Sequence, residues 1–239
     1  MCQATATTSG GNVLSNDHVL SNDPSTRRHL GRRLIQLYAG LVLYGASVAL
    51  LVKADLGLAP WIVLDQGLSE LTGLSIGTIV IVMGAVVLLL WIPLRQRPGL
   101  GTISNFLLVG LALDGTLAAM PDAHTLTARV PLLAGGILLN GVATGLYIAA
   151  RFGPGPRDGL MTGLHQRTGR SIRLIRTAIE AAVLVTGFAL GGTVGVGTIL
   201  YALSIGPLSQ LFLRVFAVPT ASGSTVVAAG PSARAILPR

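Results

Sequence analysis

Two short segments interrupt an otherwise apolar chain with prolines, glycines and charged side chains that could bind a small solute. They occupy residues 56–75, LGLAPWIVLDQGLSELTGLS, and residues 152–171, FGPGPRDGLMTGLHQRTGRS. Their candidate binding residues are Pro60, Trp61, Asp65, Pro156, Arg157 and Asp158. Proline suits the first turn of a helix, where its missing N–H is not needed. A helix that begins there directs unpaired N–H groups and a partial positive charge at what precedes it, which attracts anions and lone pairs.

A purely structural interpretation of the same two segments stays open. They can be connectors at a membrane interface that simply contain good turn residues. In that case Trp61 would serve as an interfacial anchor. Asp158 would then only favour the start of a helix.

Further polar residues fall inside apolar stretches, where such groups are costly and are candidates for function. They are Asn105, Asp114, Asn140, Glu180 and Gln210. We expect Glu180 to pair with Arg176 one helical turn earlier, although an unpaired glutamate would take up a proton and could exchange it. Asp114 and Gln210 each follow a glycine by four residues, and we expect them to form a hydrogen bond between helices. Asn105 and Asn140 suit similar contacts.

Motifs of enzymes and of metal or cofactor sites are missing from the sequence. His165 has no partner at metal-ligand spacing, and Cys2 is the single cysteine. There is no phosphate-binding loop, no serine nucleophile elbow and no zinc-protease motif. We therefore expect no bound metal, no cofactor and no enzymatic activity.

The composition indicates a helical membrane protein. Of 239 residues, 51% are apolar and 11% are charged, and the mean hydropathy is +0.70. Several apolar runs approach the roughly 20 residues that a helix needs to cross a bilayer. The net charge of +8 comes mainly from arginines that flank these runs, so it favours contact with the lipid bilayer and not with nucleic acid.

The apolar runs predict an all-α fold, a polytopic helical membrane protein with six spans. We place the spans at residues 34–53, 75–94, 101–120, 130–150, 171–190 and 196–217. The two proline-containing segments are too short to cross a bilayer, so we expect each to form an interrupted or re-entrant helix. Residues 1–26 and 219–239 lack apolar periodicity, and we expect both tails to be disordered.

The placement of basic residues predicts the orientation in the membrane. With a cytoplasmic N-terminus, Lys53 and Arg129 lie outside, whereas the many arginines of residues 27–33, 95–97 and 151–176 lie inside. This is the usual bias of inner-membrane proteins. We therefore expect a multi-pass protein of the inner (plasma) membrane with both termini in the cytoplasm.

The two halves of the chain resemble each other. Residues 34–115 align with residues 130–211 at a constant offset of 96 without a gap, and 26 of the 82 positions are identical. Shared glycines and prolines indicate that the two copies share backbone geometry. Each copy has three predicted spans, an odd number, so we expect residues 34–120 and 130–217 to form a 3+3 inverted repeat.

The two segments also carry motifs of a known family. The matching residues are Leu56, Gly57, Ala59, Pro60 and Trp61 in the first segment and Gly153, Gly155, Pro156, Arg157, Asp158, Gly159, Leu160 and Met161 in the second. In these residues the sequence resembles the YczE/YyaS/YitT-like bacterial integral membrane proteins, a largely uncharacterised group. The resemblance covers about residues 34–217 and implies a multi-span inner-membrane protein, without a substrate or catalytic residues.

The repeat and its interrupted helices favour transport. In many transporters an inverted repeat brings such helices together near the midplane, where the solute binds. We therefore expect a small secondary transporter for a small polar or anionic solute, with a path lined by the two segments. The alternative is a scaffold or regulator that binds a partner or lipid through the arginine-rich residues 151–176. The sequence leaves open whether the chain forms a homo-oligomer.

Overall fold

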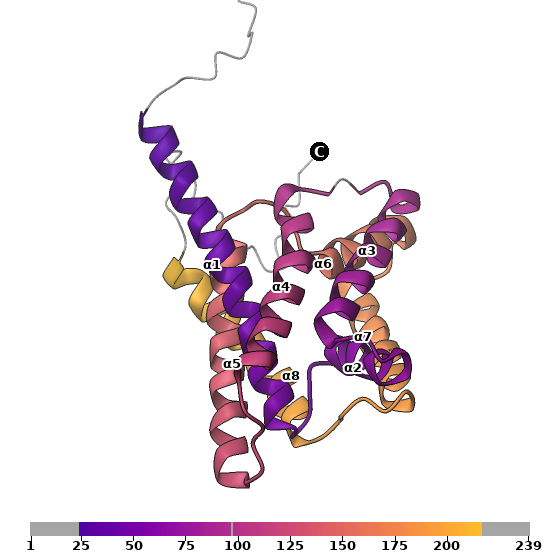
Figure 1. The fold of residues 1–239 in the computed structure, drawn as a ribbon. Coiled ribbons are helices and arrows are strands. Elements are labelled where there is room, and N and C mark those ends of the chain that lie inside the picture. Colours follow the sequence, from indigo (N-terminus) through magenta and orange to yellow (C-terminus); the bar gives the residue numbers. More distant parts are fainter. Residues whose placement is uncertain (1–23, 97, 217–239) are drawn as a thin grey trace, which may run out of the picture.

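The computed structural model describes residues 24–96 and 98–216, and all regular structure within them is helical (Figure 1). The helices are α1 (Pro24–Ala54), α2 (Pro60–Thr72), α3 (Ile76–Leu94), α4 (Leu100–Ala119), α5 (Leu126–Ala149), α6 (Pro156–Thr168), α7 (Ile172–Ala189) and α8 (Val196–Phe216). The predicted all-α fold is confirmed for this part of the chain.

The helix boundaries repeat along the chain. The short helices α2 and α6 have 13 residues each and begin at Pro60 and Pro156, which are 96 positions apart. The same offset of 96 separates the first residue of α3 from that of α7, and the first residue of α4 from that of α8. Each short helix follows a glycine with positive φ, 118° at Gly57 and 115° at Gly153, a conformation that glycine adopts without strain.

Five helices are long and apolar enough to cross a membrane: α1 from Leu30 onward, α3, α4, α5 and α8. The remaining predicted span is α7, which has 18 residues but carries three charged side chains, Arg173, Arg176 and Glu180. The short helices α2 and α6 are below the length of a span.

The first helix begins at Pro24, earlier than the sequence predicts. Residues 24–26, assigned to a disordered tail, form the start of α1 because proline is well tolerated in the first turn of a helix. The rest of that tail, the C-terminal tail at residues 219–239, Arg97 and the last residue of the predicted final span lie outside the described residues.

The long helices α1 and α5 pack against each other, and the first turns of α1 extend beyond α5, as Figure 1 shows. Glycines allow the close approach, since a methyl group on Gly136 would lie 2.8 Å from the Leu51 side chain. The buried Asn140 of α5 donates a hydrogen bond to Ser47 of α1 at 2.8 Å. Around this pair, α4 packs on α1 and α8 packs on α5. Each short helix packs against the other half of the chain, α2 on α7 and α6 on α3.

Two reciprocal backbone hydrogen bonds tie the halves together. Gly101, in the first turn of α4, donates to the carbonyl of Phe152 at 3.0 Å. Gly197, in the first turn of α8, donates to the carbonyl of Leu56 at 2.7 Å. These residues are equivalent at the offset of 96, so the connection before each short helix is held by the last helix of the other copy.

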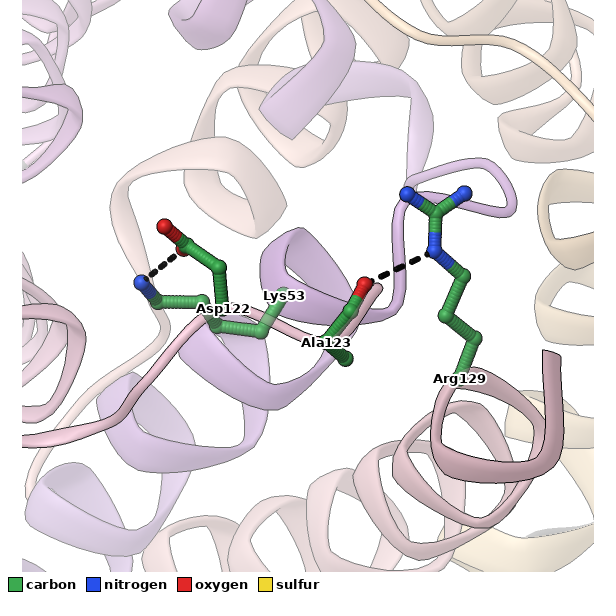
Figure 2. A network of polar contacts seen from close by, with 4 residues as sticks. All are labelled: Lys53, Asp122, Ala123 and Arg129. Atoms are coloured by element: carbon green, nitrogen blue, oxygen red, sulfur yellow. Dashed lines mark hydrogen bonds and ion pairs between the residues drawn. The ribbon is translucent and has the colours of Figure 1, made fainter. Parts of the chain in front are cut away.

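Polar contacts distinguish the two ends of the helix bundle. At one end Arg33 of α1 donates from Nε to the carbonyl oxygen of Ala150 at 3.0 Å. At the other end Lys53 lies 2.5 Å from the Asp122 carboxylate. Nearby, Arg129 donates to a carbonyl of the α4–α5 connection at 3.0 Å, as Figure 2 shows. The two basic residues predicted to lie outside therefore lie together at one end.

Candidate functional site

Residues from all of the described helices line a cavity of about 410 Å³. Its apolar wall includes Trp61, Met83, Phe106 and Ile148. Its polar and charged lining residues are Tyr44, Asn105, Thr144, Tyr147, Arg157, Asp158, Arg176, Glu180, Tyr201, Ser209 and Gln210. The cavity therefore combines an apolar body with a few ionisable groups, which is typical of a small-molecule site.

The N-terminal turns of both short helices border the cavity. Ala59 precedes α2 and Gly155 precedes α6, and neither can cap the helix with its side chain. Both residues and the prolines that follow them line the cavity. Backbone N–H groups in these first turns have no partner within their helix, and the helix dipoles add partial positive charge. The two proline-initiated helix starts of the sequence interpretation thus lie at one cavity.

Arg157 connects the two short helices. Its Nη2 atom lies 3.2 Å from Oδ2 of Asp65, and its guanidinium carbon lies 4.8 Å from the centre of the Trp61 ring. Asp65 is 0% exposed, whereas 30% of the Arg157 side chain is exposed. Trp61 is buried within the protein, so it packs beneath the guanidinium and does not act as an interfacial anchor.

Two buried polar atoms at this junction have no hydrogen-bond partner among the described residues. They are Oδ1 of Asp65 and Nε1 of Trp61. Buried polar groups are normally satisfied, because an unpaired one costs about 1–3 kcal/mol. The junction of α2 and α6 is therefore polar but incompletely satisfied.

A second ion pair lies on α7. Nε of Arg176 is 2.8 Å from Oε1 of Glu180, and both residues line the cavity. The expected pairing across one helical turn is therefore confirmed. Asp158, in the first turn of α6, accepts a long hydrogen bond of 3.4 Å from the Tyr147 hydroxyl.

Burial changes the protonation of the carboxylates on the short helices. It raises the pKa of Asp65 to about 6, and the positive charge of Arg157 opposes this rise. Burial also raises the pKa of Asp158, with Arg176 and Arg157 opposing it. At the far end of the bundle, the hydrogen bond from Lys53 lowers the pKa of Asp122. The carboxyl groups of Asp65 and Asp158 therefore hold protons more readily than carboxyl groups in water.

Asp114 and Gln210, a pair suggested by the sequence, lie in different surroundings. Asp114 accepts from Ser75 Oγ at 2.6 Å and from Gly77 N–H at 2.8 Å, and it is not part of the cavity lining. Gln210 of α8 lines the cavity, so the hydrogen bond expected between it and Asp114 of α4 is wrong. Asp114 is satisfied instead by the start of the neighbouring helix α3.

The two asparagines have different surroundings. Asn105 lines the cavity. Asn140 is 1% exposed and accepts a hydrogen bond from the Tyr201 hydroxyl at 3.0 Å, in addition to the bond that it donates to Ser47. Asn140 therefore links α1, α5 and α8 beneath the cavity wall, as expected of a polar residue between helices.

No motif in the sequence indicates a role for Tyr147, Tyr201 or Trp91. Trp91 of α3 is buried and donates from Nε1 to the carbonyl of Pro156 at 3.0 Å, which fixes the start of α6. Three of the four tyrosines in the chain line the cavity. Their scarcity together with their position inside apolar runs is the signal that could have identified them. Within the described residues, no group of three or more histidine, cysteine or acidic side chains could hold a metal ion.

Comparison with known proteins places the chain among membrane proteins. Residues 31–214 match a family described as "Family of unknown function (DUF6198)". An "Uncharacterized protein" of Haemophilus influenzae is 42% identical over 183 residues, which cover 77% of this chain and 84% of the relative. The "Uncharacterized membrane protein YczE" of Bacillus subtilis is 32% identical over 184 residues, 76% of this chain and 83% of the relative. The B. subtilis "Uncharacterized protein YyaS" is 25% identical over 180 residues, 74% of this chain and 90% of the relative. No solved structure matches the chain.

Proposed function

Because the chain belongs to the DUF6198 family and is a multi-pass membrane protein, we propose from the geometry of its cavity that it is a secondary transporter for a small polar or anionic solute. One observation carries this proposal. The unpaired N-terminal turns of α2 and α6, together with Arg157, meet at a cavity of about 410 Å³ that lies between the halves of the chain.

The proposal includes a 3+3 inverted repeat with six spans. α7 serves as the sixth span because Arg176 and Glu180 pair with each other at the cavity, which lowers the cost of placing both charges within the membrane. The reciprocal contacts of α4 and α8 with the opposite copies support a pseudo-twofold relation between the halves. Irregular backbone before each short helix is tolerated at membrane depth because it borders a cavity.

The proposed orientation follows the basic residues. The end of the bundle where Arg33 contacts the carbonyls of Ala150 and Arg151 faces the cytoplasm, and the end that contains Lys53 and Arg129 faces outward. Both termini are then cytoplasmic, and the protein resides in the inner (plasma) membrane.

Arg157 gives a direct test of solute binding. The purified protein is screened by thermal unfolding in detergent against a panel of small carboxylates, inorganic phosphate and neutral polar solutes. Solutes that stabilise it are then tested for uptake into proteoliposomes. We expect Arg157→Gln to abolish both effects, because it removes the cationic group exposed to the cavity from α6. Arg173→Gln is the matched control, since Arg173 is exposed on the neighbouring helix and is not part of the cavity lining.

The competing function is that of a scaffold or regulator that binds a partner or lipid through residues 151–176. A scaffold should show no stabilisation by any solute of the panel and no uptake. Its binding to the partner or lipid should weaken as strongly in Arg173→Gln as in Arg157→Gln, because a surface interaction depends on exposed arginines. That pattern would replace the transporter proposal.

A further inference from the structure

Asp65 is a fully buried carboxylate that depends on one cation. It is 0% exposed, and Nη2 of Arg157 lies 3.2 Å from its Oδ2 atom. Its Oδ1 atom has no hydrogen-bond partner among the described residues. Asp65 is not part of the cavity lining, so a solute in the cavity reaches it only through Arg157.

Arg157 lies at the boundary between the cavity and the buried Asp65. Its side chain is 30% exposed and lines the cavity, while its guanidinium also contacts Asp65 and stacks on Trp61. A guanidinium carries five N–H donors in a fixed plane and binds carboxylates and phosphates well. A solute anion in the cavity therefore competes with Asp65 for the same cation.

The other charged groups near the junction do not replace Arg157. α2 packs against α3 and α7. α3 has no charged residue between Ile76 and Leu94, and the Arg176 of α7 is paired with Glu180. On α6 the nearest additional charge is Asp158, an acid, and the titratable groups on α1, α5 and α8 that line the cavity are tyrosines, Tyr44, Tyr147 and Tyr201. Among the described residues, Arg157 is the cation that stabilises ionised Asp65.

Removal of that cation leaves a buried charge without a partner. Such a charge is strongly unfavourable, and the carboxyl group takes up a proton instead. Resting on the proposed function, we propose that Asp65 is the proton site of the transporter and becomes protonated when an anionic solute binds to Arg157. Solute and proton then bind together, and each raises the affinity of the other by the same factor, as thermodynamic linkage requires.

This coupling defines the solute class and the energy source. The solute is a small anion, and the aromatic wall formed by Trp61, Phe106 and Tyr44 suits a monocarboxylate with an apolar body. The bound complex holds a neutral Asp65 and an Arg157–anion pair. An inward proton gradient then drives accumulation of the anion, one proton with each anion, because the anion cannot bind tightly without the proton.

The test uses the full-length protein in detergent with benzoate, phenylacetate and inorganic phosphate as probes. Isothermal titration calorimetry in buffers of different ionisation enthalpy measures the number of protons taken up with each bound anion. Between the pKa of Asp65 in the free protein and its higher pKa in the complex, we expect about one proton per bound anion and an affinity that falls about tenfold per pH unit. Asp65→Asn mimics the protonated acid, so it should bind the probe without proton uptake and without the pH dependence. Asp122→Asn, at an exposed position outside the cavity lining, should behave as the wild type.

The outcomes separate the two proposals. Two results would overturn the role of Asp65 and leave the transporter proposal standing. One is that the wild type binds a probe without proton uptake. The other is that the pH dependence of probe affinity persists in Asp65→Asn. If Asp65→Asn does not fold, a wild-type count near zero overturns the role of Asp65, and a count near one supports it only if it persists in Asp158→Asn, which removes the other carboxyl group with a raised pKa at the cavity. If no probe binds at any pH and none is transported, the proposal of an anion transporter fails, and the role of Asp65 fails with it.

Discussion

Substitution of Gly159 by alanine should disturb the candidate site through packing alone. Gly159 lies in α6, and the buried ring of Trp91 packs directly on it. An added methyl group would overlap Cζ2 of that ring and lie 2.5 Å from Cη2. The ring is 2% exposed and is held by its hydrogen bond to Pro156, so it has little room to move.

The expected cost is the difference of two opposing effects. Overpacking of a buried site costs about 1–3 kcal/mol, and a ring held on all sides corresponds to the upper part of this range. Alanine recovers about 1 kcal/mol because it forms helix more readily than glycine. The net loss is about 2 kcal/mol, which for a chain of this size lowers the midpoint of thermal unfolding by about 4–8 °C.

The assay is thermal unfolding in detergent, followed by solute binding. Gly115→Ala in α4 is the matched control, because nothing lies within 4 Å of the position of its added methyl group. The control should be neutral or up to about 1 kcal/mol more stable. We also expect Gly159→Ala to weaken solute binding, since α6 carries Arg157. Wild-type stability together with wild-type binding in Gly159→Ala would refute the described contact between α3 and α6.

Two further predictions concern buried polar groups. Because native Asp65 holds its proton more tightly than the unfolded chain does, with a pKa raised from 3.8 to about 6, stability should be highest below about pH 4 and fall by about 3 kcal/mol as the pH rises to about 6. Thermal unfolding across this range should show a smaller fall in Asp65→Asn, and an unchanged fall would contradict the assignment. Asn140→Ala should cost about 1–3 kcal/mol, because it removes the partner of Ser47 and Tyr201 inside the protein. In the same assay, Asn105→Ala at the cavity surface should lower the free energy of unfolding clearly less than Asn140→Ala does. Equal losses would contradict the different surroundings of the two asparagines.

The sequence predicts those features that depend on neighbouring residues. The short helices are recognisable because proline fixes their first turn and glycine permits their last one, and the structure begins them at Pro60 and Pro156. The Arg176–Glu180 pair is predictable because residues four apart lie on one face of a helix. The correspondence of the two halves follows from shared glycines and prolines, which leave the same backbone geometry in both copies.

Contacts between distant residues are not predictable in this way. Asp65 and Arg157 are 92 positions apart, and they meet only because each short helix packs against the other half of the chain. The hydrogen bond that the sequence suggests between Asp114 and Gln210 is wrong for a related reason. Equivalence in a repeat does not imply contact, and Ser75 and Gly77 at the start of α3 lie closer to its carboxylate than α8 does.

If the two halves are inverted relative to each other, two equivalent connections must lie on opposite sides of the membrane. Pro98 and Val194 are 96 positions apart, are exposed, and lie in the α3–α4 and α7–α8 connections. Each is replaced by cysteine in a Cys2→Ser background and labelled in intact cells with a membrane-impermeant maleimide. We expect Val194→Cys to be labelled from outside and Pro98→Cys to be labelled only after the membrane is opened. Labelling of both positions from the same side would contradict the inverted repeat and the transport proposal that depends on it.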